Sequence, residues 1–154
     1  MRAVRTVFSV SVGLLFSGTA LSLASAAEFG TADEARAMLE RVVAAIQDDK
    51  EQALGDFNAG AEGYKEKDLY VFCTDDAGTF TAHGANQDLL GENILVMQDQ
   101  SGKRFGGEIY GNAVESEFSE VDYLWPRPGE SEPVEKATFV TKVDDQVCAV
   151  GYYK

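Results

Sequence analysis

The clearest hydrophobic pattern lies at the start of the region that we expect to fold. Apolar residues recur there at three- and four-residue spacing, which is typical of an amphipathic helix: Ala35, Met38, Leu39, Val42, Val43 and Ile46. Thr31-Ala-Asp-Glu34 precedes them as a capping box. The pattern predicts one long helix ending near Asp48. A shorter or broken helical stretch then runs to about Gly60, because its glycines weaken it.

The rest of the chain is dominated by short runs rich in β-branched and aromatic residues, separated by turn residues. These runs predict strands at 69–73, 79–83, 119–125, 134–143 and 146–153. A short helical turn at 86–93 and a helix over 103–115 separate the second strand from the third. Two helices, two strands, short helices and three strands together predict an α+β domain.

The first 26 residues read as a secretory signal peptide. Arg2 and Arg5 form a positive start, 7–23 is apolar, and Ala24-Ser25-Ala26 is a small-residue cleavage site. We therefore expect one domain at 27–154, located in the periplasm or secreted from a bacterium. An uncleaved membrane anchor is the alternative, although Ser, Gly and Thr residues make this stretch a poor spanning helix.

Charge narrows the range of partners. The formal net charge is −13, and the predicted signal peptide contains two of the arginines and no acid. Such a surface repels phosphate backbones and anionic lipid, so we expect no nucleic-acid partner and no membrane insertion after signal removal. The same charge favours solubility.

The two cysteines, Cys73 and Cys148, bear on the compartment. In an exported protein they are expected to pair, with two buried free thiols as the alternative. No C-x-x-C motif supports a redox role.

The residues that could carry catalysis are sparse. His83 is the chain's one histidine, there is no G-x-S-x-G motif, and no second histidine could share a metal. Asp75, Asp76, Asp99 and Asp145 lack the spacing of a calcium loop and are expected to form turns with solvated charge. We therefore expect no enzyme, no metal and no cofactor.

Three residues of the later strands could form a binding site. Tyr123 and Trp125 lie two apart and share a strand face, and Lys136 begins the next strand. If Lys136 points inward, the three form an aromatic chamber with one positive charge, which suits a short carboxylate. The alternative is ordinary core aromatics with a solvated lysine. Tyr110, in the predicted third helix, is a further candidate.

The order of these segments resembles the single Cache domain, a PAS-like extracytoplasmic small-molecule sensor, from about Ala32 to Tyr153. The resemblance rests on Leu69-Tyr-Val-Phe-Cys73, Asp75-Asp-Ala-Gly78, Thr79-Phe-Thr-Ala-His83, Leu89-Leu-Gly-Glu-Asn93, Val121-Asp-Tyr-Leu-Trp125, Lys136-Ala-Thr-Phe-Val140 and Val147-Cys-Ala-Val-Gly-Tyr-Tyr153. It implies a five-stranded antiparallel sheet ordered 2-1-5-4-3. The long N-terminal helix would pack on one face, and short helices would cover the ligand face. That order makes the strands of Cys73 and Cys148 neighbours.

The resemblance also suggests a function. Ala82-His83 matches a pair that Cache domains often carry, although Gly84 stands where the family commonly has proline. It implies reversible binding of a small organic anion such as acetate, propionate or pyruvate, in chemotaxis and signal transduction. His83, Tyr123, Trp125 and Lys136 would converge on the sheet face opposite the long helix.

Lys154 directly follows the last predicted strand, so we expect a stand-alone domain without its own output module. Its partner would be a membrane receptor or another signalling protein. The alternative is a non-catalytic interaction or accessory module whose own side chains fill the pocket.

Overall fold

The computed structural model describes residues 28–154, so the predicted signal peptide lies outside the described residues. Two helices come first, α1 (Ala32–Asp48) and α2 (Lys50–Ala59). The strands are β1 (Lys65–Glu66), β2 (Leu69–Asp75), β3 (Phe80–His83), β4 (Ser119–Pro126), β5 (Pro133–Val143) and β6 (Gln146–Tyr153). Between β3 and β4 lie two 3-10 turns and a short helix: η1 (Gln87–Leu89), η2 (Ile94–Val96) and α3 (Phe105–Gly111).

The sheet is antiparallel and has the predicted strand order. β3 pairs with β2, and β2, β6, β5 and β4 follow across the sheet, which confirms the expected order 2-1-5-4-3. The α+β architecture is likewise confirmed. A sixth strand, β1, adds two residues to the outer edge of β2. Two residues are too few for an alternating pattern, so this strand could not be predicted.

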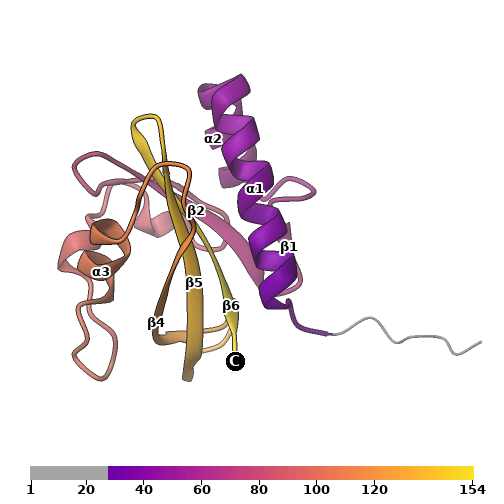
Figure 1. The fold of residues 1–154 in the computed structure, drawn as a ribbon. Coiled ribbons are helices and arrows are strands. Elements are labelled where there is room, and N and C mark those ends of the chain that lie inside the picture. Colours follow the sequence, from indigo (N-terminus) through magenta and orange to yellow (C-terminus); the bar gives the residue numbers. More distant parts are fainter. Residues whose placement is uncertain (1–27) are drawn as a thin grey trace, which may run out of the picture.

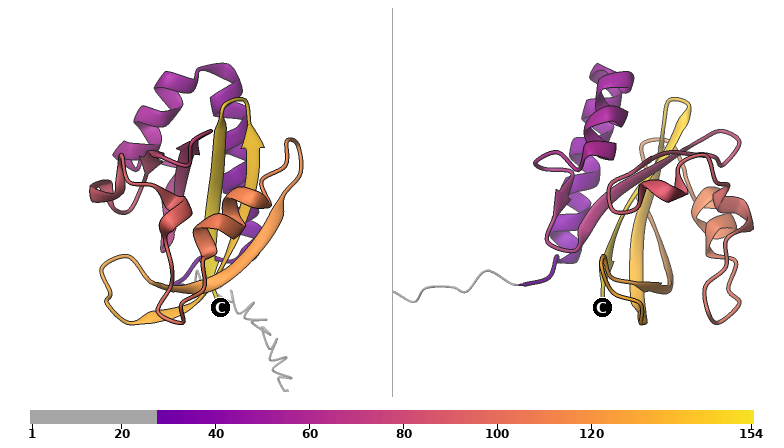
Figure 2. Two further views of the ribbon diagram at one scale, coloured as in Figure 1. Left: turned by 90° about the vertical axis from the view of Figure 1, so that its left-hand side faces the viewer. Right: turned by 180° about the vertical axis from the view of Figure 1, so that it is seen from behind.

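The two faces of the sheet are covered by different parts of the chain. α1 lies along one face, and the segment between β3 and β4, which we call the covering segment, lies over the other (Figure 1). The second and third views show the same layers from the side and from behind (Figure 2). Within residues 28–154, no helix is long and apolar enough to cross a membrane.

Capping explains where the first helices begin and end. Thr31 Oγ1 accepts a hydrogen bond from the Glu34 amide at 3.2 Å, and the Glu34 carboxylate accepts one from the Thr31 amide at 2.9 Å. The predicted capping box is therefore formed. Asp49 is extended, and its side chain accepts from the Gln52 amide, so it ends α1 and starts α2. Gly60 ends α2 in the left-handed conformation.

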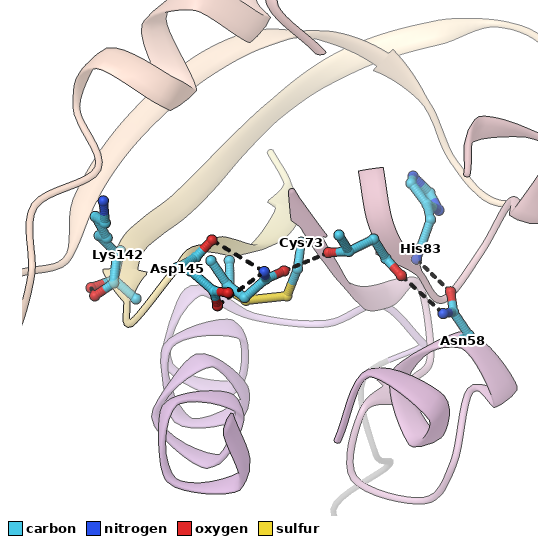
Figure 3. Close-up of a disulfide and its surroundings, with 9 residues drawn as sticks. Asn58, Cys73, His83, Lys142 and Asp145 are labelled. Carbon is cyan, nitrogen blue, oxygen red and sulfur yellow. Dashed lines mark hydrogen bonds between the residues drawn. A yellow bond between two sulfur atoms is a disulfide. The ribbon is translucent and has the colours of Figure 1, made fainter. Parts of the chain in front are cut away.

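A disulfide joins the two central strands beneath α1. Cys73 and Cys148 are directly opposite in the register of β2 and β6, with Cα atoms 4.1 Å apart, and both are fully buried (Figure 3). They belong to the apolar core that α1 seals with Met38, Leu39 and Val42. The predicted disulfide is therefore present and lies on the helix-covered side of the sheet.

Asp99 in the covering segment corrects one expectation. Its carboxylate is buried rather than solvated: Oδ1 accepts from the amides of Ser101 and Lys103, and Oδ2 accepts from the Leu124 amide. Burial opposes ionisation of Asp99, but these hydrogen bonds outweigh it and lower the pKa to about 2. Asp99 thus ties the covering segment to β4.

The third helix is shorter than predicted. Its pattern extended to residue 115, whereas α3 ends at Gly111, because three of its seven residues are glycines and resist helix formation. Gly106 is needed for packing, since a Cβ there would overlap the carbonyl oxygen of Ile94 in η2. The covering segment therefore lies close against the sheet.

Candidate ligand-binding site

A small cavity, which we call the inner chamber, lies between the sheet and the covering segment. Its volume is about 20 Å³, room for about one water molecule. Its lining is almost wholly aromatic and aliphatic: Tyr70, Phe72, Phe80, His83, Leu89, Ile94, Met97, Phe105, Tyr123 and Trp125.

A larger hollow, which we call the vestibule, adjoins the inner chamber. Its volume is about 290 Å³. The two share Tyr70, His83, Leu89 and Trp125, and the vestibule adds Ala85, Asn86, Pro126, Arg127, Pro128, Gly129 and Glu130. Of these shared residues, Tyr70 and His83 are buried, whereas Leu89 and Trp125 are only half-buried.

His83 lies at this boundary, at the end of β3. The Asn58 side chain on α2 holds the strand: its Oδ1 accepts from the His83 amide at 2.9 Å, and its Nδ2 donates to the Thr81 carbonyl at 3.1 Å (Figure 3). The ring Nδ1 of His83 accepts from the amides of Ala85 and Asn86. Nε2 therefore carries the proton in the neutral ring and is its available donor.

The charge state of His83 follows from its surroundings. Burial, followed by the nearby positive charge of Lys136, lowers its pKa to about 4. The ring is therefore neutral near pH 7. Gly84, which stands where the resemblance led us to expect proline, donates its amide to the Val71 carbonyl at 2.8 Å. A proline could not make that bond.

Tyr123 and Trp125 both line the inner chamber, on the sheet face opposite α1. The ring of Phe105 from α3 stacks on Tyr123 with centroids 4.3 Å apart and meets Trp125 edge-on at 5.3 Å. The Tyr123 hydroxyl accepts from Thr138 Oγ1 at 3.0 Å. The covering segment is thus fastened to β4 through aromatic rings.

Lys136 is on the same face but does not line the inner chamber or the vestibule. It is 1 % exposed, and its Nζ donates to the Tyr70 hydroxyl at 2.7 Å. The ammonium lies 4.1 Å from the ring centroid of Tyr70 and 5.0 Å from that of Tyr153. The structure therefore brings Lys136 against Tyr70, and Tyr70 lines both spaces.

The pKa values of Lys136 and Tyr70 are both strongly shifted. Burial lowers the pKa of Lys136 to about 7, and the negative charge of Asp68 only partly offsets that effect. Burial also raises the pKa of Tyr70 well above its ordinary value. The Tyr70 oxygen accepts from Lys136, and a hydrogen bond with Tyr153 adds to the rise in the pKa of Tyr70.

Tyr110, the remaining candidate, is not brought to the site. Its hydroxyl donates to the carbonyl of Asp76, and it lines neither the inner chamber nor the vestibule.

The sequence analysis did not identify Tyr70 and Arg127 as site residues. Tyr70 and Phe72 alternate along β2, so strand periodicity could have placed them on the face of Tyr123. Arg127 follows a proline in a loop and carries no comparable signal.

The described residues hold no group of three or more His, Cys, Asp and Glu side chains that could bind a metal ion. The donors of the site are the His83 Nε2–H and the Lys136 ammonium, which reaches the site through the Tyr70 hydroxyl. Such donors in an aromatic space suit an acceptor-rich anion.

Comparisons with known proteins agree with this fold. A curated relative, the methyl-accepting chemotaxis protein McpP of Pseudomonas putida, is 29 % identical over 75 residues. That segment is 49 % of this chain and 14 % of the relative, so the chain spans only a small part of that protein's length.

Solved structures match over a larger share of the chain. A methyl-accepting chemotaxis protein from Vibrio parahaemolyticus matches with a TM-score of 0.64 and 22 % identity, covering 79 % of this chain and 86 % of that one. A periplasmic sensor domain of a chemotaxis protein matches with a TM-score of 0.60 and 26 % identity, covering 79 % and 88 %. A Cache chemosensory domain described as recognising carboxylic acids has a TM-score of 0.58 and 22 % identity, covering 75 % and 83 %.

The family comparison accounts for nearly all of the described chain. The sequence matches the family described as single Cache domain 2 over residues 30–152. This range contains α1, α2, the covering segment and the whole sheet except the last residue of β6. The chain therefore belongs to the single Cache domain 2 family of sensor domains.

Proposed function

We propose that this chain is an exported, non-catalytic domain that binds a short organic carboxylate for signalling. One observation carries the proposal. The buried ammonium of Lys136 donates to the Tyr70 hydroxyl, and Tyr70 lines the aromatic space that also holds the neutral His83 donor. A carboxylate there would accept from Tyr70 and His83, and its charge would offset that of Lys136.

The size of the space indicates how such a ligand would enter. A volume of about 20 Å³ is too small for a carboxylate with a carbon chain, whereas the vestibule has about 290 Å³. The half-buried side chains of Leu89 and Trp125 separate the two. We propose that these two side chains move apart when the ligand enters. The relative described as recognising carboxylic acids supports this ligand class.

A calorimetric and thermal-unfolding screen tests the proposal, with acetate, propionate and pyruvate as probes. A ligand at about 100 times its Kd should raise the free energy of unfolding by about 2.7 kcal/mol. Lys136→Met should abolish this gain. Lys142→Met is the matched control, because Lys142 is also on β5 but is half-exposed and paired with Asp76. Unchanged affinity in Lys136→Met would show that Lys136 has no role.

The small inner chamber favours a second candidate function, an accessory module whose own side chains fill the pocket. In that case Phe105 and Trp125 would be permanent core residues packed on Tyr123. None of the three acids would then raise the unfolding temperature. The same screen therefore separates the two candidates.

Export is proposed from the sequence of residues 1–26, which would be removed after translocation. Intact-mass measurement of protein recovered outside the cytoplasm should give a chain that begins at Ala27. A mass that includes residues 1–26 would instead indicate the uncleaved anchor. We further propose that the domain acts with a membrane receptor or another signalling protein.

A further inference from the structure

A buried carboxylate lies at the turn between β1 and β2. Asp68 is 7 % exposed, and its two oxygens contact different segments. Oδ1 accepts from the Gly30 amide at 2.6 Å, and Oδ2 lies 3.3 Å from the Nε of Arg127. Asp68 therefore connects the segment leading into α1 with the loop between β4 and β5.

Aromatic rings hold Arg127 on two sides. Its guanidinium carbon lies 4.5 Å from the ring centroid of Phe29 and 4.9 Å from that of Tyr153. The Tyr153 hydroxyl also donates to the Pro126 carbonyl, at 2.7 Å. The start of α1, the end of β6 and the β4–β5 loop gather at the same end of the molecule (Figure 2). Arg127, in the β4–β5 loop, contacts Phe29 just before α1 and Tyr153 at the end of β6.

Arg127 also has unused donors beside the pocket. A guanidinium has five N–H groups, and among the described residues Arg127 forms a hydrogen bond or ion pair through Nε alone. The same side chain lines the vestibule. An anion in the vestibule could accept from the terminal N–H groups while Nε stays on Asp68.

We propose that Arg127 is a second anion-contacting residue of the pocket and couples ligand binding to the segment that leads into α1. The inference rests on the proposed carboxylate-binding function. A carboxylate bound to the terminal nitrogens holds the guanidinium in place between Phe29 and Asp68. The Asp68–Gly30 hydrogen bond is then opened less often, and the start of α1 is held more firmly.

Close packing at Gly30 makes this coupling specific. A Cβ on Gly30 would overlap the side chain of Leu69, so this segment lies directly against β2. Its amide faces the Asp68 carboxylate, and the neighbouring Phe29 is 43 % exposed. Exchange of the Gly30 amide with solvent deuterium therefore reports on this contact alone.

The test measures amide exchange and affinity together, in the purified protein, with acetate and propionate as probes. Saturating propionate should slow exchange of the Gly30 amide about fivefold or more. Arg127→Gln should remove that effect and weaken binding about tenfold. By reciprocity, Phe29→Ala should also weaken binding, because it frees the guanidinium.

Phe118→Ala is the matched control. It removes a similar arginine–ring contact, in which the guanidinium of Arg36 lies 4.9 Å from the Phe118 ring centroid, but neither residue lines the vestibule. The control should leave both affinity and Gly30 exchange unchanged. If propionate binds but Gly30 exchange does not change, the coupling is refuted and the binding function stands. If sodium chloride at equal ionic strength gives the same slowing, the coupling is also refuted. If calorimetry detects binding of none of acetate, propionate and pyruvate, both proposals fail.

Discussion

The Nζ of Lys136 donates to the Tyr70 hydroxyl over 2.7 Å, and the two residues come from strands on either side of β6. Tyr70 lines the inner chamber and Lys136 does not. The charge of Lys136 therefore acts on the chamber through the hydroxyl of Tyr70, which it polarises. In the proposed function, Lys136 would be a positioning residue and Tyr70 the group that touches the ligand.

Tyr70→Phe should test this relationship. It removes the acceptor of the Lys136 ammonium, and an unpartnered buried charge should lower the free energy of unfolding by about 1–3 kcal/mol at pH 6. Urea unfolding measures this loss, which should be smaller at pH 9, where Lys136 is neutral. Tyr152→Phe is the control, since its half-exposed hydroxyl only meets Glu120 at 3.4 Å. Equal losses in both variants would argue against a special role for Tyr70.

Gly151→Ala should displace Lys136 without changing its chemistry. A Cβ at Gly151 would overlap Cε of Lys136 and crowd Oγ1 of Thr138, so the lysine side chain crosses β6 where a side chain is missing. We expect a loss of about 1–3 kcal/mol in unfolding free energy from overpacking, together with weaker carboxylate binding. Gly107→Ala is the control, because no atom lies within 4 Å of its Cβ position. If Gly151→Ala binds acid normally, the path of Lys136 over Gly151 is unimportant for binding.

The affinity for carboxylates should depend on pH through Lys136. Its pKa is lowered from the ordinary 10.5 to about 7. Above pH 7 the empty protein loses this proton, so binding must restore it, and affinity should fall by up to about tenfold per pH unit. Calorimetry in buffers of different ionisation enthalpy should show uptake of nearly one proton at pH 8. Lys142→Met should keep both effects, whereas Lys136→Met should show no binding at any pH in this range.

The lowered pKa of Lys136 also makes the free energy of unfolding depend on pH. Between pH 7 and 10.5 the unfolded chain holds the Lys136 proton and the folded protein does not. The contribution of Lys136 to the free energy of unfolding therefore rises with pH in this window, and the penalty for a buried ammonium is fully present below pH 7. A bound carboxylate should reduce that penalty.

Sequence patterns predicted the helices and strands because those signals are local, whereas the strand order came from the resemblance to the single Cache domain. Three-four spacing located α1, the Thr31 and Glu34 pair located its start, and alternation placed Tyr123 and Trp125 on one face. Compartment and strand adjacency predicted the disulfide between Cys73 and Cys148. Each of these expectations needed only neighbouring residues or a known strand order.

The site was predicted less completely because it depends on distant contacts. Alternation left open whether Lys136 points inward. The lysine pairs with Tyr123 in the sheet, and its amine turns toward Tyr70 because Gly151, on another strand, leaves room. Asp68 and Asp99 look like ordinary turn acids in the sequence. They are buried because amides or charges from remote segments satisfy them: Gly30 and Arg127 for Asp68, and Leu124 for Asp99. No local pattern encodes such partners.

The disulfide should stabilise the fold without affecting the pocket. Cys73 and Cys148 are 75 residues apart, so the chain-entropy estimate for their cross-link is about 4 kcal/mol. Both lie in the core under α1, on the opposite sheet face from Tyr70 and Tyr123. Replacing both cysteines with alanine should therefore lower the free energy of unfolding by a few kcal/mol, which urea titration measures. Carboxylate affinity should stay within about a factor of two, because the two sites share no side-chain contacts. A large loss of affinity in the still-folded variant would show that the disulfide helps to shape the pocket through β2.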